Sequence, residues 1–490
     1  MTPYDAIIIG AGTAGLPCAI AASEAGARVA LVEKSGRVGG TLHVNGGQMS
    51  AAGTRRQRER GIVDSPDAHF GEVLRIGHGL ADKSLVRLAV EEAPKTLDWL
   101  DDLGFPFSPE VPAVWHGHEP YEVPRTYWGP DAGRSVLATL HKPWTQALAT
   151  GNVTLLLEHA LEEILPGRGA PPTVVVRGPG GRLPLQAETV VLATGGYAAN
   201  PDLFAELTPG APRLVSGAPL TSSGDGLVAA RAIGADIRGG ACQLPSLGAV
   251  ELGELSGRAD VWSSWLNLVP QHRRPREIHV NVRGERFLRE DEPSVHLRER
   301  AVAGQPDQTF WVVFDERART AGESLLTWES PEGLKARAAA GDGVWAADDI
   351  GSLATAAGVA PDGLLETARQ WNRAVSSGRD EFRRENPDHP LATPPFYAVR
   401  SVAATFLSFG GLRIDPEFHV LDSAGMPIPG LHAIGELIGA ATTMGDAFVG
   451  GMCVTPALSF GRLLGRRLSA SPRSRSARPD SNNTPTHLTP

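Results

Sequence analysis

The stretch from Asp5 to Glu33, DAIIIGAGTAGLPCAIAASEAGARVALVE, constrains the fold more than any other part of this chain. An apolar run meets a G-x-G-x-x-G motif, a helical apolar pattern follows, and a second apolar run ends in an acid. This order predicts a strand, a helix and a parallel second strand that together bind a dinucleotide. Glycines also occur in ordinary turns, so the motif alone is weak evidence. The two apolar runs, the helical pattern and the terminal acid around it make the prediction of a dinucleotide site specific.

Each glycine of this motif has a mechanical reason. Gly10 permits the tight turn, Gly12 lets the backbone approach a pyrophosphate, and Gly15 lets the helix pack close to the strand. The helix N-terminus offers free N–H groups and the positive end of its dipole to the phosphates. We expect Glu33 to accept hydrogen bonds from ribose hydroxyl groups.

Length, charge and cysteine content limit the number of domains and the kinds of partner that this chain can have. A chain of 490 residues predicts two or three domains, and a net charge of -9 argues against nucleic-acid and anionic-membrane partners. Its three cysteines are far apart, so we expect neither a disulfide framework nor a metal site. The first strand begins close to Met1 and no apolar run reaches membrane-spanning length, so the expected location is the cytoplasm.

A glycine-rich segment, Gly39 to Gly53, follows the first unit and reads GGTLHVNGGQMSAAG. Two glycine pairs with little apolar periodicity suggest backbone that lies against a flat ligand. The segment resembles the FAD-binding arm of the fumarate reductase and 3-ketosteroid Δ1-dehydrogenase flavoproteins. The resemblance extends to Leu468 and implies an α/β fold, with a Rossmann-like FAD-binding domain and an inserted α+β capping domain.

We therefore expect four regions. Residues 1–237 form the first part of the FAD-binding domain, 238–351 the capping or substrate domain with Trp262 and Trp265, and 352–469 the return segment. Residues 470–490 are polar and rich in proline and serine, which predicts a disordered tail. Helices are expected within 66–104, and two more from Asp348 onward.

Further motifs of the family recur along the chain. They are the A-T-G-G that ends the strand before Tyr197, the T-S-S-G-D-G that opens a helix, the G-E at Glu436 and a last glycine pair. The resemblance assigns FAD contacts to Gly10, Gly12, Ala14, Gly15, Glu33, Lys34, Gly40, Thr41, Gly46, Gly47, Ala160, Ala193, Thr194, Gly195, Asp225, Glu436, Gly451 and Val454. The covalent family members carry their histidine nearer Gly40 than His43, so we expect FAD to be non-covalent.

The resemblance implies a reaction that adds or removes hydrogen across a C–C bond next to a carbonyl. A hydride moves between substrate Cβ and flavin N5, a proton moves at Cα, and hydrogen-bond donors stabilise the carbonyl oxygen. The family's acid, an arginine or a tyrosine, falls at Ser294, eight residues after Arg286. A substrate-binding histidine is lost near Gln243, and the substrate-clamping arginine aligns with Phe448.

Some candidates for the substrate site lie on a loop, Trp115 to Gly129, that is rich in aromatic and polar groups, and the others lie at the positions that the resemblance marks or close to them. The expected catalytic residues are Tyr121, Tyr127, Ser294 and His296, and the expected substrate-binding residues are Arg125, Gln243, Phe448 and Gly450. The alternatives are an aromatic surface loop, a solvent-facing His296, and an Arg125 salt bridge to Glu119 or Glu122.

These features predict an FAD-dependent dehydrogenase that desaturates a cyclic ketone or keto acid. A reductase of the fumarate or urocanate kind is the competing enzyme, and a non-catalytic FAD-binding protein is the alternative of another class. We find no second G-x-G-x-x-G motif for a nicotinamide, so the expected partners are a small carbonyl substrate and an electron acceptor such as O2 or a quinone-like dye.

Overall fold

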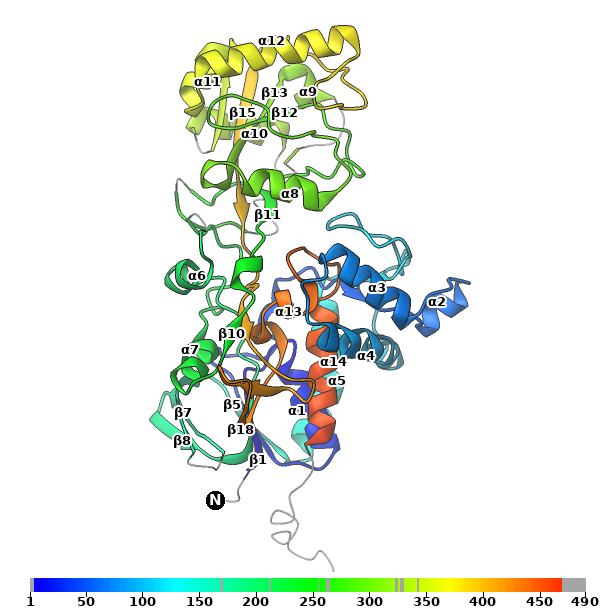
Figure 1. Ribbon diagram of the computed structural model, residues 1–490, viewed down its shortest axis with the longest axis vertical. Helices are drawn as coiled ribbons and strands as arrows, with labels where there is room; N and C mark the ends of the chain where they lie inside the picture. The colour runs from blue at the N-terminus through cyan, green and yellow to red at the C-terminus, as the bar shows by residue number, and fades with distance from the viewer. Residues whose placement is uncertain are drawn as a thin grey trace, which may run out of the picture.

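The computed structural model describes residues 4–167, 171–210, 213–253, 255–260, 265–321, 325–326, 330–341 and 343–468. Figure 1 shows that these residues form two lobes, a lower one that contains both ends of the described chain and an upper one built from its middle. Trp262 and the predicted tail, 470–490, lie outside the described residues.

A six-stranded sheet forms the centre of the lower lobe, and its strand order is β17-β18-β9-β1-β2-β5. The strands are β1 (Tyr4–Ile9), β2 (Val29–Val32), β5 (Val153–Leu156), β9 (Ala187–Leu192), β17 (His419–Leu421) and β18 (Pro427–Ala433). All neighbours are parallel except β17, which pairs antiparallel with β18. The predicted first unit is confirmed, because β1 and β2 pair in parallel and α1 (Gly15–Glu24) connects them.

Helix α1 packs against the last helix, α14 (Val454–Arg467), as Figure 1 shows. A Cβ atom added at Gly461 would lie 2.2 Å from the Ala14 carbonyl oxygen, and one at Gly465 would lie 2.3 Å from that of Cys18. Only glycine allows the two helices to approach this closely. Helix α14 is thereby fixed against the helix that follows the dinucleotide motif.

The other lower-lobe elements surround this sheet. The helices are α2 (Arg55–Glu59), α3 (Pro66–Ile76), α4 (Lys83–Asp102), α5 (Gly133–Ala149), α6 (Pro201–Leu207), α7 (Asp225–Ala232) and α13 (Ala441–Met444). Two short two-stranded sheets accompany them. One pairs β3 (Met49–Ser50) with β4 (Thr126–Tyr127), and the other pairs β10 (Ile237–Arg238) with β16 (Gly411–Leu412). The helices predicted within 66–104 are confirmed, since Ser65 and Asp82 cap α3 and α4. Helix α7 begins directly after Gly224, as the T-S-S-G-D-G motif predicts, and no side chain caps it.

The segment after Asn152 contributes strands to two different sheets. It divides into β5, which joins the main sheet, and β6 (Ala160–Leu165), which pairs with β7 (Thr173–Gly178); β8 (Gly181–Leu185) completes this antiparallel sheet. Glu158 separates the two strands with a φ of 58°, a left-handed conformation that turns the chain.

The upper lobe contains a second, antiparallel sheet. Its strands are β11 (Ser246–Ala249), β12 (Ile278–Val280), β13 (Thr309–Asp315), β14 (Val344–Ala347) and β15 (Phe396–Ala404), and its helices are α8 (Val295–Ala303), α9 (Glu316–Thr320), α10 (Pro331–Ala340), α11 (Ile350–Ala357) and α12 (Pro361–Ser377). The longest strand, β15, pairs with β11, β13 and β14. The two helices predicted from Asp348 onward are confirmed as α11 and α12.

The boundary expected at residue 352 does not match this arrangement. Leu353 of α11 and Trp371 of α12 pack with Ile278 and Val313 in one buried cluster of the upper lobe. Strand β15 belongs to the sheet of the same lobe, so the chain returns to the lower lobe only after Ala404. The structure therefore places 352–404 with the capping lobe rather than with the FAD-binding domain.

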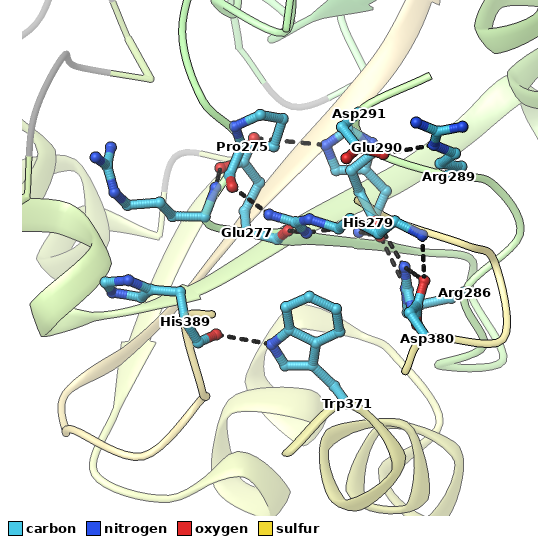
Figure 2. A network of polar contacts seen from close by, with 12 residues as sticks. Pro275, Glu277, His279, Arg286, Arg289, Glu290, Asp291, Trp371, Asp380 and His389 are labelled. Atoms are coloured by element: carbon cyan, nitrogen blue, oxygen red, sulfur yellow. Dashed lines mark hydrogen bonds and ion pairs between the residues drawn. The ribbon is translucent and has the colours of Figure 1, made fainter. Parts of the chain in front are cut away.

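A buried network of charged groups, drawn in Figure 2, ties the loop after α12 to the rest of the upper lobe. Arg286 contacts Glu290 at 2.6 Å and Asp380 at 2.6 Å, and Trp371 donates to the His389 carbonyl at 2.8 Å. Arg286 and Glu290 belong to the segment Gly284 to Glu290, which reads GERFLRE and here stabilises the capping lobe. Breaking such a buried pair costs several kcal/mol, roughly 3–5, because one charge is left without a partner.

Candidate functional site

A cavity of about 260 Å³ lies in the lower lobe, at the carboxyl ends of β1, β2 and β9. This edge of a parallel sheet is where ligands bind in open α/β folds. Of the residues assigned to FAD, the cavity is lined by Gly10, Gly12, Ala14, Glu33, Lys34, Gly40, Thr41, Ala193, Thr194, Gly195, Asp225, Glu436 and Val454. Segments far apart in the sequence thus meet around one space.

The remaining assigned residues, Gly15, Gly46, Gly47, Ala160 and Gly451, do not line this cavity. A Cβ atom at Gly15 would lie 1.8 Å from the Gly10 carbonyl oxygen, and one at Gly451 would lie 2.2 Å from the Ser50 nitrogen. These glycines allow close backbone packing around the cavity. Gly15 has the packing role that the sequence predicted for it.

Glu33, the acid that ends β2, is buried with 8% of its surface exposed. Its Oε2 accepts from the Ala11 N–H at 2.9 Å and its Oε1 from the Ser35 N–H at 2.8 Å. These bonds hold the carboxylate beside the glycine-rich turn. Lys34, the next residue, contacts Asp225 at 2.8 Å and Ser223 at 2.6 Å, which joins α7 to the edge of the cavity.

Glu436 also lines the cavity, and its Oε1 accepts from the Ser408 N–H at 3.0 Å. Burial raises the pKa of this carboxyl to about 7, and the bonds from Ser408 oppose that rise. Near neutral pH the group is therefore present in both protonation states. A protonated carboxyl both donates and accepts, which suits contact with a hydroxyl group.

The cavity fits FAD on three observations from the residues themselves. A Cβ atom at Gly195 would meet nothing within 4 Å, and one at Gly12 only the Gly40 Cα atom at 3.8 Å, so backbone there is open to a ligand. Helix α14 begins at Val454, at the edge of the cavity, and its N-terminal dipole favours a developing negative charge. Glu33 and Glu436 both line the cavity and supply carboxyl oxygens as acceptors.

Tyr121 and Gly450 come together beyond this cavity. The Tyr121 hydroxyl donates to the Gly450 carbonyl at 2.7 Å and lies 3.3 Å from the His69 Nε2 atom. Burial raises the pKa of the Tyr121 phenol and lowers that of His69, so both are neutral near pH 7. His69 was not identified from the sequence, because a single histidine on a helix carries no local signal.

Tyr127 and Arg125 occupy buried positions that do not suit the expected roles. The Tyr127 hydroxyl pairs with Thr54 Oγ1 at 2.6 Å and its ring is 0% exposed. Arg125, also 0% exposed, is held by Asp64 at 2.8 Å and by Glu72 at 2.9 Å. The guanidinium is thus occupied by two carboxylates, neither of them the Glu119 or Glu122 considered from the sequence.

Phe448 stands where the resemblance expects a substrate-clamping arginine, and it is 4% exposed. Its ring stacks on His118 at 5.0 Å and meets Phe409 edge-on at 5.4 Å. Burial lowers the pKa of His118 to about 4, so this imidazole is neutral at pH 7. Gln243 Oε1 accepts from the Phe409 N–H at 3.2 Å. Gln243 thus contacts the backbone of the residue whose ring meets Phe448.

Ser294 and His296 lie at the start of α8, in the upper lobe. Both contact Glu119 of the lower lobe, through Ser294 Oγ at 2.8 Å and the His296 N–H at 3.3 Å. Burial, Arg300 and His78 lower the pKa of His296. The structure thus brings two expected catalytic residues to the junction of the lobes, and their partner Glu119 was considered from the sequence only as a partner of Arg125.

Among the described residues, no group of three or more histidine, cysteine or acidic side chains could hold a metal ion. No helix in the same described ranges combines the length and apolar character needed to cross a bilayer.

Comparisons with known proteins agree with this site. The model of the FAD binding domain family matches residues 5–451. An NADH:fumarate oxidoreductase of Klebsiella pneumoniae is 29% identical over 474 residues, which cover 96% of this chain and 48% of that protein. The chain thus spans about half the length of this relative.

Two other similarities cover nearly the whole of both proteins. A 4-oxocyclohexanecarboxylate 2-dehydrogenase of Sinomonas cyclohexanicum is 27% identical, with 95% of this chain and 93% of that protein covered. The structure of a 3-ketosteroid delta1-dehydrogenase of Sterolibacterium denitrificans has a TM-score of 0.75 at 22% identity and covers 97% of this chain and 100% of that chain. At this identity the likeness shows a shared fold.

Proposed function

Because the chain belongs to the FAD binding domain family and is an FAD-dependent oxidoreductase that acts on CH–CH bonds, we propose that it is a desaturase of a cyclic ketone or keto acid. The proposed product carries a C=C bond next to the carbonyl group. When bound, FAD supplies the acceptor for the hydride that leaves Cβ of the substrate.

The observation that carries this proposal is the apolar wall around Phe448. Phe406 and Leu407 line the cavity, and Phe448 packs between His118 and Phe409. Neither Phe448 nor the two rings that it contacts, His118 and Phe409, carries a positive charge at pH 7, because burial lowers the pKa of His118 to about 4. A dicarboxylate needs cationic partners, whereas a ring with one carbonyl group does not.

The arginines near the junction of the lobes are already paired. Arg125 is held by Asp64 and Glu72, and Arg300 contacts Asp446 at 2.5 Å. Each substrate carboxylate that bound one of these arginines would have to displace an existing carboxylate. This arrangement favours a substrate with at most one carboxylate over fumarate.

We assign the proton chemistry to two groups. The raised pKa of Tyr121 keeps it a phenol, and in this proposal its single O–H turns from the Gly450 carbonyl to the substrate carbonyl oxygen, where negative charge develops. The lowered pKa of His296 keeps it neutral and able to accept a proton from Cα, with Ser294 beside it. Tyr127 and Arg125 have structural roles in this proposal.

FAD is proposed to bind without a covalent link. The His43 Nε2 atom lies 2.9 Å from the Val38 carbonyl, and His43 is absent from the described residues that line the cavity. Mass spectrometry of the denatured protein tests this point. Release of all FAD on denaturation agrees with the proposal, and flavin that stays attached to the polypeptide contradicts it.

A second candidate is the reverse reaction, the reduction of an enoate, which the Klebsiella pneumoniae relative favours by its name. Product analysis separates the two. FAD-loaded protein is incubated with 4-oxocyclohexanecarboxylate and a quinone-like dye, and the ketone is examined for a new conjugated C=C bond. Enone formation supports the desaturase, while turnover of fumarate or urocanate by the chemically reduced protein, without enone formation, supports the reductase.

A further inference from the structure

Glu119 of the lower lobe lies at the N-terminus of helix α8 of the upper lobe. Its Oε2 accepts from Ser294 Oγ at 2.8 Å and from the His296 N–H at 3.3 Å. Ser294 is itself the N-cap of α8, because its Oγ accepts from the Leu297 N–H at 3.2 Å. One carboxylate thus binds the start of a helix across the junction of the two lobes.

Backbone pairing connects Glu119 to the substrate side of the lower lobe. Glu119 forms an isolated parallel bridge with Val449, which lies between Phe448 and Gly450. Two residues further along, Tyr121 donates to the Gly450 carbonyl at 2.7 Å. The contact with α8 therefore arises from the same short backbone unit that presents the apolar wall.

A second contact between the lobes is an ion pair. Arg300 of α8 lies 2.5 Å from Asp446, and His78 lies 2.6 Å from the same carboxylate. The side chains of Arg300 and Asp446 are 39% and 22% exposed, so water screens this pair. Glu119 instead meets a backbone N–H at a helix N-terminus, where the dipole favours a carboxylate.

We propose that Glu119 is a positioning residue that holds α8, and with it Ser294 and His296, over the substrate side of the FAD-binding lobe. For the roles of Ser294 and His296 this inference rests on the proposed function. The contact itself does not, since it joins the lobes whatever the substrate is. Figure 1 shows α8 on the side of the upper lobe that faces the lower lobe.

Amide hydrogen exchange of the FAD-loaded protein, without substrate, tests the contact. In Glu119→Ala the His296 and Leu297 amides are expected to exchange faster by roughly fivefold, which is what losing an average helix cap produces. Glu119→Gln keeps an oxygen that accepts from both donors, so it should restore most of the protection. Glu122→Gln, an exposed acid on the same loop, is the matched control and should leave exchange unchanged.

A double-mutant cycle completes the test. If Glu119 acts through Ser294, then Ser294→Ala and Glu119→Ala together should change exchange at α8 by less than the product of the two single effects. Wild-type exchange in Glu119→Ala, or an equal effect of Glu122→Gln, would overturn the proposal. If the protein does not convert a ketone, these exchange results are unaltered. The desaturase proposal and the positioning role of Glu119 can therefore be contradicted independently.

Discussion

Tyr121 donates its hydroxyl proton to the backbone carbonyl of Gly450 at 2.7 Å, across 329 positions of sequence. This bond joins the aromatic loop to the last glycine pair, just before the helix that closes the cavity. The Tyr121 ring also lies 3.7 Å from where a Cβ atom of Gly450 would be. An alanine Cβ at Gly450 would therefore make an ordinary van der Waals contact with the ring of the proposed carbonyl-binding tyrosine.

The two tyrosines of the loop should respond differently to loss of their hydroxyl groups. Tyr121→Phe is expected to lower kcat by about 10²–10³, the usual cost of removing one donor to a developing oxyanion. Tyr127→Phe loses only the bond to Thr54, so it should cost about 1 kcal/mol of stability and leave kcat within a fewfold. Steady-state kinetics and urea unfolding measure both effects. Equal loss of kcat in the two variants would contradict the assignment.

Gly15 should tolerate no side chain. An alanine Cβ would lie 1.8 Å from the Gly10 carbonyl oxygen, so Gly15→Ala should destabilise the protein by more than the roughly 1–3 kcal/mol of ordinary overpacking. Gly36→Ala is the matched control, because nothing lies within 4 Å of its Cβ position. Thermal unfolding of the two FAD-loaded variants measures the difference. A Gly15→Ala protein as stable as Gly36→Ala would show that helix α1 does not pack as described.

Glu436 should contribute to FAD binding through hydrogen bonds rather than charge. Burial raises its pKa to about 7, so Glu436→Gln imitates a form that already exists at neutral pH. We expect Glu436→Gln to bind FAD with nearly wild-type affinity and Glu436→Ala to weaken it by roughly tenfold, the loss of about 1.4 kcal/mol. Titration of the apoprotein with FAD, followed by flavin fluorescence, gives both constants. A strong loss in Glu436→Gln would contradict this prediction.

His279 should make the capping lobe sensitive to acid. Burial lowers its pKa from 6.5 to about 4, with Glu290 and Glu277 opposing the shift and Arg384 and Arg298 supporting it. Between these two values the unfolded chain binds more protons, so stability falls as the pH drops from 6.5 to 4, by roughly 3 kcal/mol at most. Above pH 7 this contribution is constant.

The variant His279→Leu isolates that contribution. Its free energy of unfolding, measured in urea from pH 7 to pH 4, should decline less steeply than that of the wild type. Parallel declines in the two proteins would mean that His279 does not titrate in this range.

The sequence predicted those parts of the fold that depend on neighbours along the chain. Gly10, Gly12 and Gly15 define the first unit within a few residues, and Ser65 and Asp349 mark helix starts through their own side chains. The FAD-binding segments could be placed for the same reason, since each motif is local.

The features that were not predicted from the sequence depend on contacts between residues far apart along the chain. Strand β15 pairs with β13, about 80 positions earlier, so no local pattern showed that 352–404 belongs to the capping lobe. Arg125 was weighed against the nearby Glu119 and Glu122, whereas its partners, Asp64 and Glu72, precede it by more than 50 positions. Glu119 itself was noticed only as a possible partner for that arginine, because its contact with α8 crosses the lobes.

The most direct test of the desaturase assignment is anaerobic mixing of the FAD-loaded protein with 4-oxocyclohexanecarboxylate, followed by the visible absorption of the flavin. Our account predicts that the oxidised-flavin band bleaches in a single turnover and that Phe448→Arg slows this step. An unchanged band with this and other saturated cyclic ketones, together with rapid reoxidation of the reduced protein by fumarate, would contradict it.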